Sequence, residues 1–232
     1  MNLANILVLG SKPNSKIPDS HFDKIYSANG AAERALNYRK KYPDVPLTCV
    51  VGASEFARNY HVTKRIIKSI PERLMVRSGE IGMPEELKNY SELICLSKKE
   101  QWNFQKNFFN FKILTLLIAE FFYHTNYIKK LIYLLKCFKN SNFQGVSTGF
   151  YAILVALKEN PDANIIISGI GMTGGPQFYK TERIKIRDNT PRSRVDRFLI
   201  KRIDSTLKKR MSSLDKDLVK IANVTLWNGK TI

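Results

Sequence analysis

Small and polar residues occur at five points of this chain where strands of a sheet are expected to end or a helix to begin. Glycine lets a ligand approach the backbone closely, and free N–H groups at the start of a helix bind phosphate. Because the carboxyl ends of parallel strands share one edge of a sheet, these segments predict a pocket for a phosphate-bearing ligand there. The segments are Gly10 to Ser15, Ala28-Asn29-Gly30, Gly52-Ala53-Ser54, Ser147-Thr148-Gly149, and Gly169-Ile170-Gly171 with Gly174-Gly175.

A second group of residues suited to phosphate chemistry lies in segment 180–210. This segment holds twelve Lys or Arg and four Asp or Glu, a net charge of +8, and follows a glycine-rich stretch that ends in Tyr179. Such a loop can fold over a phosphate and neutralise the charge that develops on a leaving phosphate. We expect Tyr179, Arg192 and Arg194 to face the sheet edge, whereas many of the lysines belong to a solvated helix face.

Several common kinds of site lack support in the sequence. Ser11 and Lys12 follow Gly10, so the dinucleotide pattern G-x-G-x-x-G is absent, and no P-loop or G-x-S-x-G motif occurs. The three histidines have no ligand partner at helical spacing, and the three cysteines lack zinc-site spacing. NAD, FAD, P-loop ATP and metal chemistry therefore lose support.

The elements that must position these residues alternate between short apolar runs and longer amphipathic ones. This alternation is typical of a parallel sheet flanked by helices, and we predict an α/β fold in one Rossmann-like domain over 1–232. Expected strands are 5–9, 24–27, 47–51, 73–77, 92–96, 164–168 and 224–227, and expected helices are 31–41, 56–69, 150–158, 193–210 and 214–222.

Residues 101–143 interrupt the alternation with aromatics and leucines mixed with lysines at helical spacing. One interpretation is a pair of helices that pack on the domain as a lid. The other, which is compatible with it, is a surface that rests on a membrane interface with its lysines facing anionic headgroups. The most apolar stretch, 108–122, is broken by three polar residues and is too short to span a bilayer.

The chain has 232 residues and an ordinary globular composition, with 44% hydrophobic and 25% charged residues. Its net charge of +18 favours acidic partners such as phosphates, acidic sugars, nucleic acid or anionic lipid. The odd, widely spaced cysteines and the absence of a recognisable leader predict a cytoplasmic protein, with peripheral attachment to the inner membrane as an extension of that prediction.

The sequence resembles the bacterial sialyltransferases of glycosyltransferase family 42 and related transferases that use CMP-activated keto-sugar acids. The resemblance covers most of the chain outside 60–143. At 6–15 the chain has ILVLGSKPNS where the family has a strand and a Gly-Asn-Gly-Pro-Ser turn, and Asn29 follows the second strand as in the family. The strongest part of the resemblance is 147–171. The chain has STGFYA at 147–152 where the family has Thr-Ser-Gly-Val-Tyr, and a helix follows in both. After that helix the chain has IIISGIG at 165–171, where the family has a strand that ends in Ser-Gly-Ile-Asp.

The resemblance implies a single Rossmann-like domain of a GT-A-like variant with a lid, acting on a CMP-activated sugar acid and a glycan or glycolipid acceptor. The nucleotide would be bound by Gly10, Ser11, Asn14 and Asn29. The donor carboxylate and the nucleotide would be held by Ser147, Thr148 and Gly149, and the cytosine would lie near Gly169 and Ile170. Tyr179 would bind the donor phosphate. No divalent metal or other cofactor would be needed, because tyrosine hydroxyls and basic residues replace it.

Two departures from the family leave the mechanism open. Gly171 stands where the family has aspartate, and segment 188–194 lacks the family's general-base histidine. Inverting transfer needs a base for the acceptor hydroxyl, and Asp188 or Glu33 can serve. The alternatives are a retaining enzyme with a carboxylate nucleophile and an inactive protein that binds the nucleotide sugar.

Two functions of other classes compete with the transferase. A pI near 9.8 is compatible with a nucleic-acid-binding module, although no RNA-recognition, OB, KH or helix-turn-helix signature is present, and we do not expect nucleic acid as a partner. A methyltransferase-like α/β enzyme would carry an acidic residue after the second strand, where Ala28-Asn29 stands. The sequence is also compatible with an oligomer.

Overall fold

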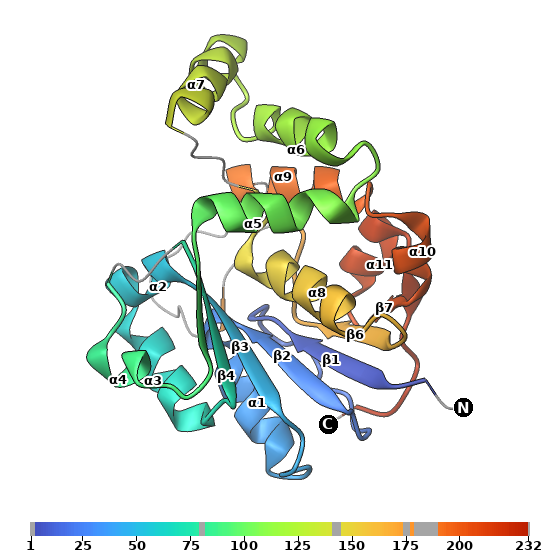
Figure 1. The fold of residues 1–232 in the computed structure, drawn as a ribbon. Coiled ribbons are helices and arrows are strands. Elements are labelled where there is room, and N and C mark those ends of the chain that lie inside the picture. Colours follow the sequence, from blue (N-terminus) through green and yellow to red (C-terminus); the bar gives the residue numbers. More distant parts are fainter. Residues whose placement is uncertain (1–2, 79–81, 141–144, 174–176, 179–189, 232) are drawn as a thin grey trace.

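The computed structural model describes residues 3–78, 82–140, 145–173, 177–178 and 190–231 (Figure 1). Its centre is one eight-stranded sheet in the order β5-β4-β3-β2-β1-β6-β7-β8, with every pair parallel. The predicted α/β class is confirmed. The strands are β1 (Asn5–Leu9), β2 (Lys24–Ala28), β3 (Leu47–Gly52), β4 (Arg73–Arg77), β5 (Leu93–Leu96), β6 (Asn164–Ser168), β7 (Met211–Ser213) and β8 (Thr225–Leu226).

The central strands are continuous apolar runs because both faces of the sheet are covered. Along β1, Ile6 and Val8 enter one core cluster, whereas Leu7 and Leu9 enter the other. The first cluster packs beneath α8 (Thr148–Glu159), α9 (Pro191–Ile200) and α11 (Lys216–Ala222). The second packs beneath α1 (Ala32–Arg39), α2 (Ala53–Arg58) and α3 (Tyr60–Ser69).

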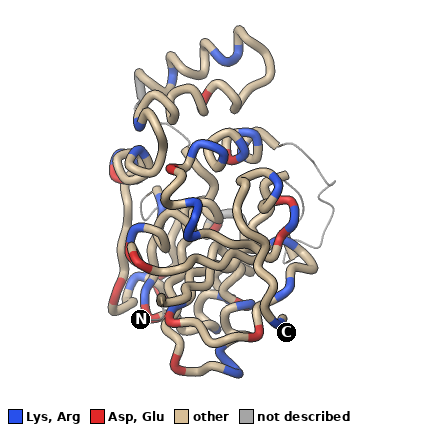
Figure 2. Tube along the Cα trace, turned by 90° about the vertical axis from the view of Figure 1, so that its right-hand side faces the viewer, with Lys and Arg blue, Asp and Glu red and all other residues tan. Residues whose placement is uncertain are grey.

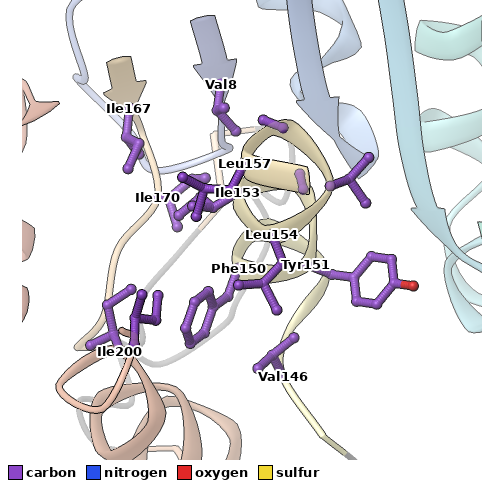
Figure 3. Packing of buried hydrophobic residues seen from close by; sticks show 14 of the residues in the cluster. Val8, Val146, Phe150, Tyr151, Ile153, Leu154, Leu157, Ile167, Ile170 and Ile200 are labelled. Carbon is purple, nitrogen blue, oxygen red and sulfur yellow. The ribbon is translucent and has the colours of Figure 1, made fainter. Parts of the chain in front are cut away.

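Helix α8 is the most deeply buried helix that the structure describes, as its sequence TGFYAILVALKE indicates. All eight residues from Phe150 to Leu157 are buried. Figure 3 shows side chains of α8 gathered with Val8 and Ile167 from the sheet and Ile200 from α9. The N-terminus of α8 is consequently held at a fixed position against the carboxyl ends of the strands.

The predicted elements match the structure except at two breaks and one strand. The predicted helix 56–69 is interrupted at Asn59, which leaves helical geometry, with φ −150° and ψ 84°. The predicted helix 193–210 splits into α9 and α10 (Ser205–Lys209) because the Asp204 carboxylate accepts from the N–H of Thr206 at 2.8 Å and starts a new helix. Strand β7, which follows at once, is too short and polar to show a strand pattern.

Residues 101–143 contribute helices that the sheet does not require. They contain most of α5 (Lys98–Gln105), the short 3-10 helix η2 (Lys106–Phe108), α6 (Lys112–Phe121) and α7 (Tyr127–Asn140). In Figure 1, α6 and α7 lie at the top of the molecule, beyond α5 and α9 and far from the sheet. Two short helical segments complete the fold, η1 (Asn29–Ala31) before α1 and α4 (Glu85–Lys88) before β5. None of the helices in the described ranges is long and apolar enough to cross a bilayer.

Strand order places a topological switch point between β1 and β6. From β1 the chain adds β2 to β5 on one side, and then returns to add β6 to β8 on the other. The loops that follow β1 and β6 therefore leave in opposite directions and open a crevice at the carboxyl ends of the strands. In open α/β sheets this crevice is where ligands bind.

Candidate functional site

A pocket of about 420 Å³ lies at this switch point. Its volume falls within the range of roughly 300–1,000 Å³ that is usual for small-molecule sites. Five segments of the chain build it: the loops after β1, β2 and β6, and the N-terminal ends of α8 and α9. The lining residues are Gly10, Ser11, Lys12, Pro13, Ala28, Asn29, Ser147, Thr148, Gly149, Gly169, Ile170, Gly171, Thr173, Gln177, Thr190, Arg192, Ser193 and Asp196.

The loops after β1 and β6 touch through their backbones. The N–H of Gly10 donates to the carbonyl of Ser168 at 2.8 Å, and the N–H of Lys12 donates to the carbonyl of Gly169 at 2.8 Å. A Cβ atom on Gly10 would lie 2.2 Å from the Gly169 carbonyl oxygen, and Gly169 has φ +77°. Both positions therefore require glycine, one for close approach and one for backbone conformation.

Two buried side chains fasten these loops from behind. Arg34 of α1 donates to the carbonyl of Gly10 at 3.1 Å and also to the carbonyl of Ser15. Asp215, before α11, accepts the N–H of Gly169 at 2.6 Å and the hydroxyl of Ser15 at 3.2 Å. The floor of the pocket is thus fixed by charge-assisted hydrogen bonds rather than by the loops alone.

Lys12 brings a positive charge to the rim. Its ammonium lies 2.8 Å from Asp217 and 3.6 Å from Asp215. Burial opposes the charged form, but the hydrogen bond to Asp217 and the charge of Asp215 outweigh it and raise the pKa of Lys12. Lys12 is therefore a fixed cation at neutral pH.

Asn29 joins the ends of two strands while it lines the pocket. Its backbone has φ +50°, a left-handed conformation that asparagine tolerates better than most residues. Its side-chain oxygen accepts the N–H of Gly52 at 3.1 Å. The predicted role of Asn29 as a pocket residue agrees with this position.

The N-terminus of α8 points its first residues into the pocket. Ser147 is the N-cap, and its hydroxyl accepts the N–H of Phe150 at 3.3 Å. The backbone N–H of Ser147 donates to the buried carboxylate of Asp196 at 2.9 Å, and burial raises the pKa of that carboxyl. A Cβ on Gly149 would lie 3.3 Å from Ile170, so the helix start and the β6 loop are in contact.

A buried arginine at the end of β4 supports the same helix start. Arg77 donates to the carbonyl of Val146 at 2.9 Å, to Gln101 at 3.0 Å and to the hydroxyl of Thr148 at 3.3 Å. Its guanidinium also lies 4.4 Å from the centre of the Tyr151 ring. Burial, followed by repulsion from Arg192, lowers the pKa of Arg77. Two arginines, Arg77 and Arg192, and the buried carboxylate of Asp196 therefore surround the pocket end of α8.

The structure brings together nine of the thirteen residues predicted for the site. Arg192 lines the pocket and donates to the carbonyl of Gly145 at 2.9 Å. Asn14 lies in a neighbouring hollow with Lys12, Arg34 and Phe178. The others that line the pocket are Gly10, Ser11, Asn29, Ser147, Thr148, Gly149, Gly169 and Ile170.

One predicted residue is turned away from the pocket, and two others lie outside the described residues. The guanidinium of Arg194 is turned to the carbonyls of Phe122 and Tyr123, each at 2.9 Å, and so holds the end of α6. Tyr179 and Asp188 lie outside the described residues. The alternative base Glu33 accepts from Arg65 at 2.6 Å and does not line the pocket. It lines two other hollows, one of which is the neighbouring hollow that contains Asn14 and Lys12.

No sequence pattern predicts the roles of the charged residues that position the pocket walls, which are Arg34, Arg77, Asp196 and Asp215. Each is a single charged residue within an ordinary amphipathic or apolar run, and no spacing pattern marks it. A buried charge becomes recognisable only when the fold shows what surrounds it. Among the described residues, no three His, Cys, Asp or Glu side chains are grouped to hold a metal ion.

Comparisons of the chain with protein-family models, with curated proteins and with solved structures find no match.

Proposed function

We propose that this protein is a glycosyltransferase that moves a sialic acid or Kdo-type sugar from a CMP-activated donor to a surface glycan or glycolipid. One observation carries the proposal. Residues that the family resemblance assigns to donor binding come from four separate parts of the chain, and eight of them line one pocket at the switch point. Strand ends of any parallel sheet meet at one edge, so the shared position supports a ligand site there, and the choice of a CMP-activated donor depends on the family resemblance of the residue types.

The charge around the pocket suits an anionic ligand. Arg192 lines it, Arg77 donates to Thr148 from behind, and Asp196 is the one carboxylate that the described lining contains. Lys12 also lines the pocket, with its charge paired to Asp217 and Asp215. Repulsion between Arg77 and Arg192 contributes to the lowered pKa of Arg77, so an anion between them would relieve an unfavourable interaction. A CMP-activated sugar acid carries both a phosphate and a carboxylate, and the N-terminus of α8 favours either.

The proposed reaction is a displacement at the anomeric carbon of the donor. The acceptor hydroxyl forms the new glycosidic bond, the bond to the CMP phosphate oxygen breaks, and a base takes the hydroxyl proton. Asp188 is the candidate base. Asp196 is a positioning residue, because its buried carboxylate already accepts the N–H of Ser147. Retention through a carboxylate nucleophile and donor binding without turnover are the alternatives.

Protein cations, rather than a divalent metal, would neutralise the leaving CMP. Among the described lining residues Arg192 is the cation in position for this, because Lys12 already pairs with Asp217 and Asp215. Tyr179 is the proposed phosphate partner by resemblance. We place the reaction in the cytoplasm, at the inner face of the membrane where a lipid-linked acceptor is available. Transfer in the presence of EDTA tests the metal-free part of this proposal.

A nucleic-acid-binding function is the second candidate, on the strength of the net charge of +18. Figure 2 shows basic residues spread over the visible trace and interspersed with acidic ones, rather than gathered in one stripe. A nucleic-acid groove usually concentrates its Lys and Arg on one face. The distribution therefore favours a local anion pocket.

The experiment that tests the function is calorimetric titration with CMP, UMP, AMP, NAD and S-adenosylhomocysteine, each with EDTA present. Selective binding of CMP, with a matching rise in melting temperature, is the expected result. The next step compares transfer from CMP-sialic acid and from CMP-Kdo. Equal binding of all nucleotides, or steeply salt-dependent binding of mixed oligonucleotides without a preference for CMP, would refute the proposal.

A further inference from the structure

Helices α6 and α7 turn apolar side chains outward to solvent. On α7 these side chains recur at helical spacing along one face, as in a helix that packs against another apolar phase. Tyr127 is 84% exposed, Ile128 70%, Leu131 59% and Leu135 61%. Phe111, at 82%, extends the surface at the start of α6. The apolar surface comprises Phe111, Ile113, Leu114, Ile118, Phe121, Phe122, Tyr127, Ile128, Leu131, Ile132, Leu135 and Phe138.

The inner side of α6 carries the polar residues. Glu120 is fully buried, and its carboxylate accepts the hydroxyl of Tyr133 at 2.9 Å and the N–H of Gly145 at 2.9 Å. Thr115, also buried, donates to the carbonyl of Asn110. A rotation of α6 that buried its apolar face would break these hydrogen bonds and separate the Glu120 carboxylate from its partners. The outward orientation of the apolar face is therefore built into the packing.

Contacts with the body of the protein hold this helical pair from the same inner side. Arg194 donates to the carbonyls of Phe122 and Tyr123, and the Phe122 ring stacks on Phe198 of α9. Within the pair, Tyr123 stacks on Tyr133 and joins α7 to the end of α6. Helices α6 and α7, here called the platform, are therefore held in place by these contacts, and their apolar face does not pack against the rest of the described protein.

The charge on the platform is almost entirely positive. Residues 111–138 contain four lysines, Lys112, Lys129, Lys130 and Lys136, and one acid, the buried Glu120. In Figure 2 the uppermost part of the trace is more blue than red. Apolar residues flanked by lysines complement a layer of acyl chains beneath anionic headgroups.

We propose that the apolar face of α6 and α7 lies in the plane of an anionic lipid bilayer and anchors the protein there. Helix α7 has 14 residues and spans about 21 Å at 1.5 Å per residue, which suits a helix lying in the interface rather than crossing it. A second copy of the chain is the poorer occupant, because two lysine-bearing surfaces would repel each other. The platform shares no residue with the pocket, so loss of vesicle binding and loss of CMP binding are separate outcomes.

The test is co-sedimentation of the full chain with vesicles of phosphatidylcholine alone and with phosphatidylglycerol added. We expect binding to the anionic vesicles only, and a drop of at least tenfold for the triple variant I128S, L131S, L135S and for K129Q, K130Q, K136Q. The controls are I67S with I70S, exposed apolar residues of the α3 end, and K40Q, K64Q, K68Q, which remove the same charge elsewhere. These controls should bind like the parent chain.

Three outcomes would overturn the proposal. The first is no vesicle binding by the parent chain. The second is equal binding to neutral and anionic vesicles, which would remove the role of the lysines. The third is sedimentation velocity that shows a dimer dissociated by I128S, L131S, L135S with no lipid effect, which would assign the surface to a second copy. Melting temperatures of all variants identify any that fail to fold.

Discussion

The carboxylate of Asp196 accepts the backbone N–H of Ser147 at 2.9 Å, and this bond ties α9 to the first residues of α8. Both residues line the pocket, and Asp196 is buried. The bond sets the position of the helix start that would face the donor.

Removing this acceptor should uncouple the two helices. D196A leaves the N–H of Ser147 without its partner, and we expect a loss of about 1–3 kcal/mol in the free energy of unfolding. CMP binding should weaken about tenfold, or 1.4 kcal/mol. D196N keeps an acceptor oxygen and serves as the control, with near-parental stability. Urea denaturation and calorimetry measure both, and equal CMP affinity in D196A would contradict the positioning role.

The contact between the β1 and β6 loops predicts strict intolerance at Gly10. G10A places a Cβ 2.2 Å from the Gly169 carbonyl oxygen, so one loop must move. We expect a loss of about 1–3 kcal/mol in stability and no measurable CMP binding. In G171A the new Cβ lies 3.5 Å from the Lys12 side chain, an ordinary contact, so this matched change should leave both properties intact. Similar affinities for the two variants would show that the loops adapt.

The two arginines at the start of α9 should behave differently. R192M removes a cation from the pocket lining, and we expect CMP affinity to fall about tenfold or more, as for a charge-assisted hydrogen bond. R194M removes bonds to Phe122 and Tyr123 and should instead lower protection of α6 in hydrogen exchange, with CMP affinity within about twofold of the parent. A large loss of CMP affinity in R194M would show that Arg194 contributes to the binding site.

Stability should fall at alkaline pH through Cys49. Burial raises the pKa of this thiol from 9.0 to about 11, so the folded state keeps a proton that the unfolded state releases. Its contribution is present below pH 9 and is lost as the pH rises through about 11. The free energy of unfolding should therefore fall more between pH 8 and 11 in the parent than in C49S, where this thiol is absent. Parallel pH profiles would show that Cys49 does not titrate as expected.

The sequence predicted the sheet well because continuous apolar runs such as Asn5–Leu9 and Asn164–Ser168 are rare outside parallel sheets. Glycine and small polar residues at the strand ends then located the pocket, because strand ends in a parallel sheet meet at one edge. The sequence pattern did not predict β7, because a strand of three residues is too short to show an alternation of apolar and polar residues.

The buried charged residues that hold the pocket loops could not be predicted from the sequence, for a different reason. Arg34 and Asp215 act on loops that are far away in sequence, and only tertiary packing brings them there. Arg194 shows the reverse case. Its position at a helix start led us to predict that it faces the pocket, but its side chain donates to carbonyls of the segment between α6 and α7. A charged residue's partner depends on the whole fold.

The pairing of β1 with β6 has a consequence for synthesis of the chain. Until residues Asn164–Ser168 leave the ribosome, β1 is an edge strand whose N–H and carbonyl groups lack a partner on one side. An apolar edge of this kind can recruit other chains, so the nascent sheet is vulnerable to aggregation for most of translation. Arrival of β6 closes that edge and, in the same event, brings Gly169 against Gly10. Protection of the β1 edge and assembly of the pocket floor are therefore one folding event.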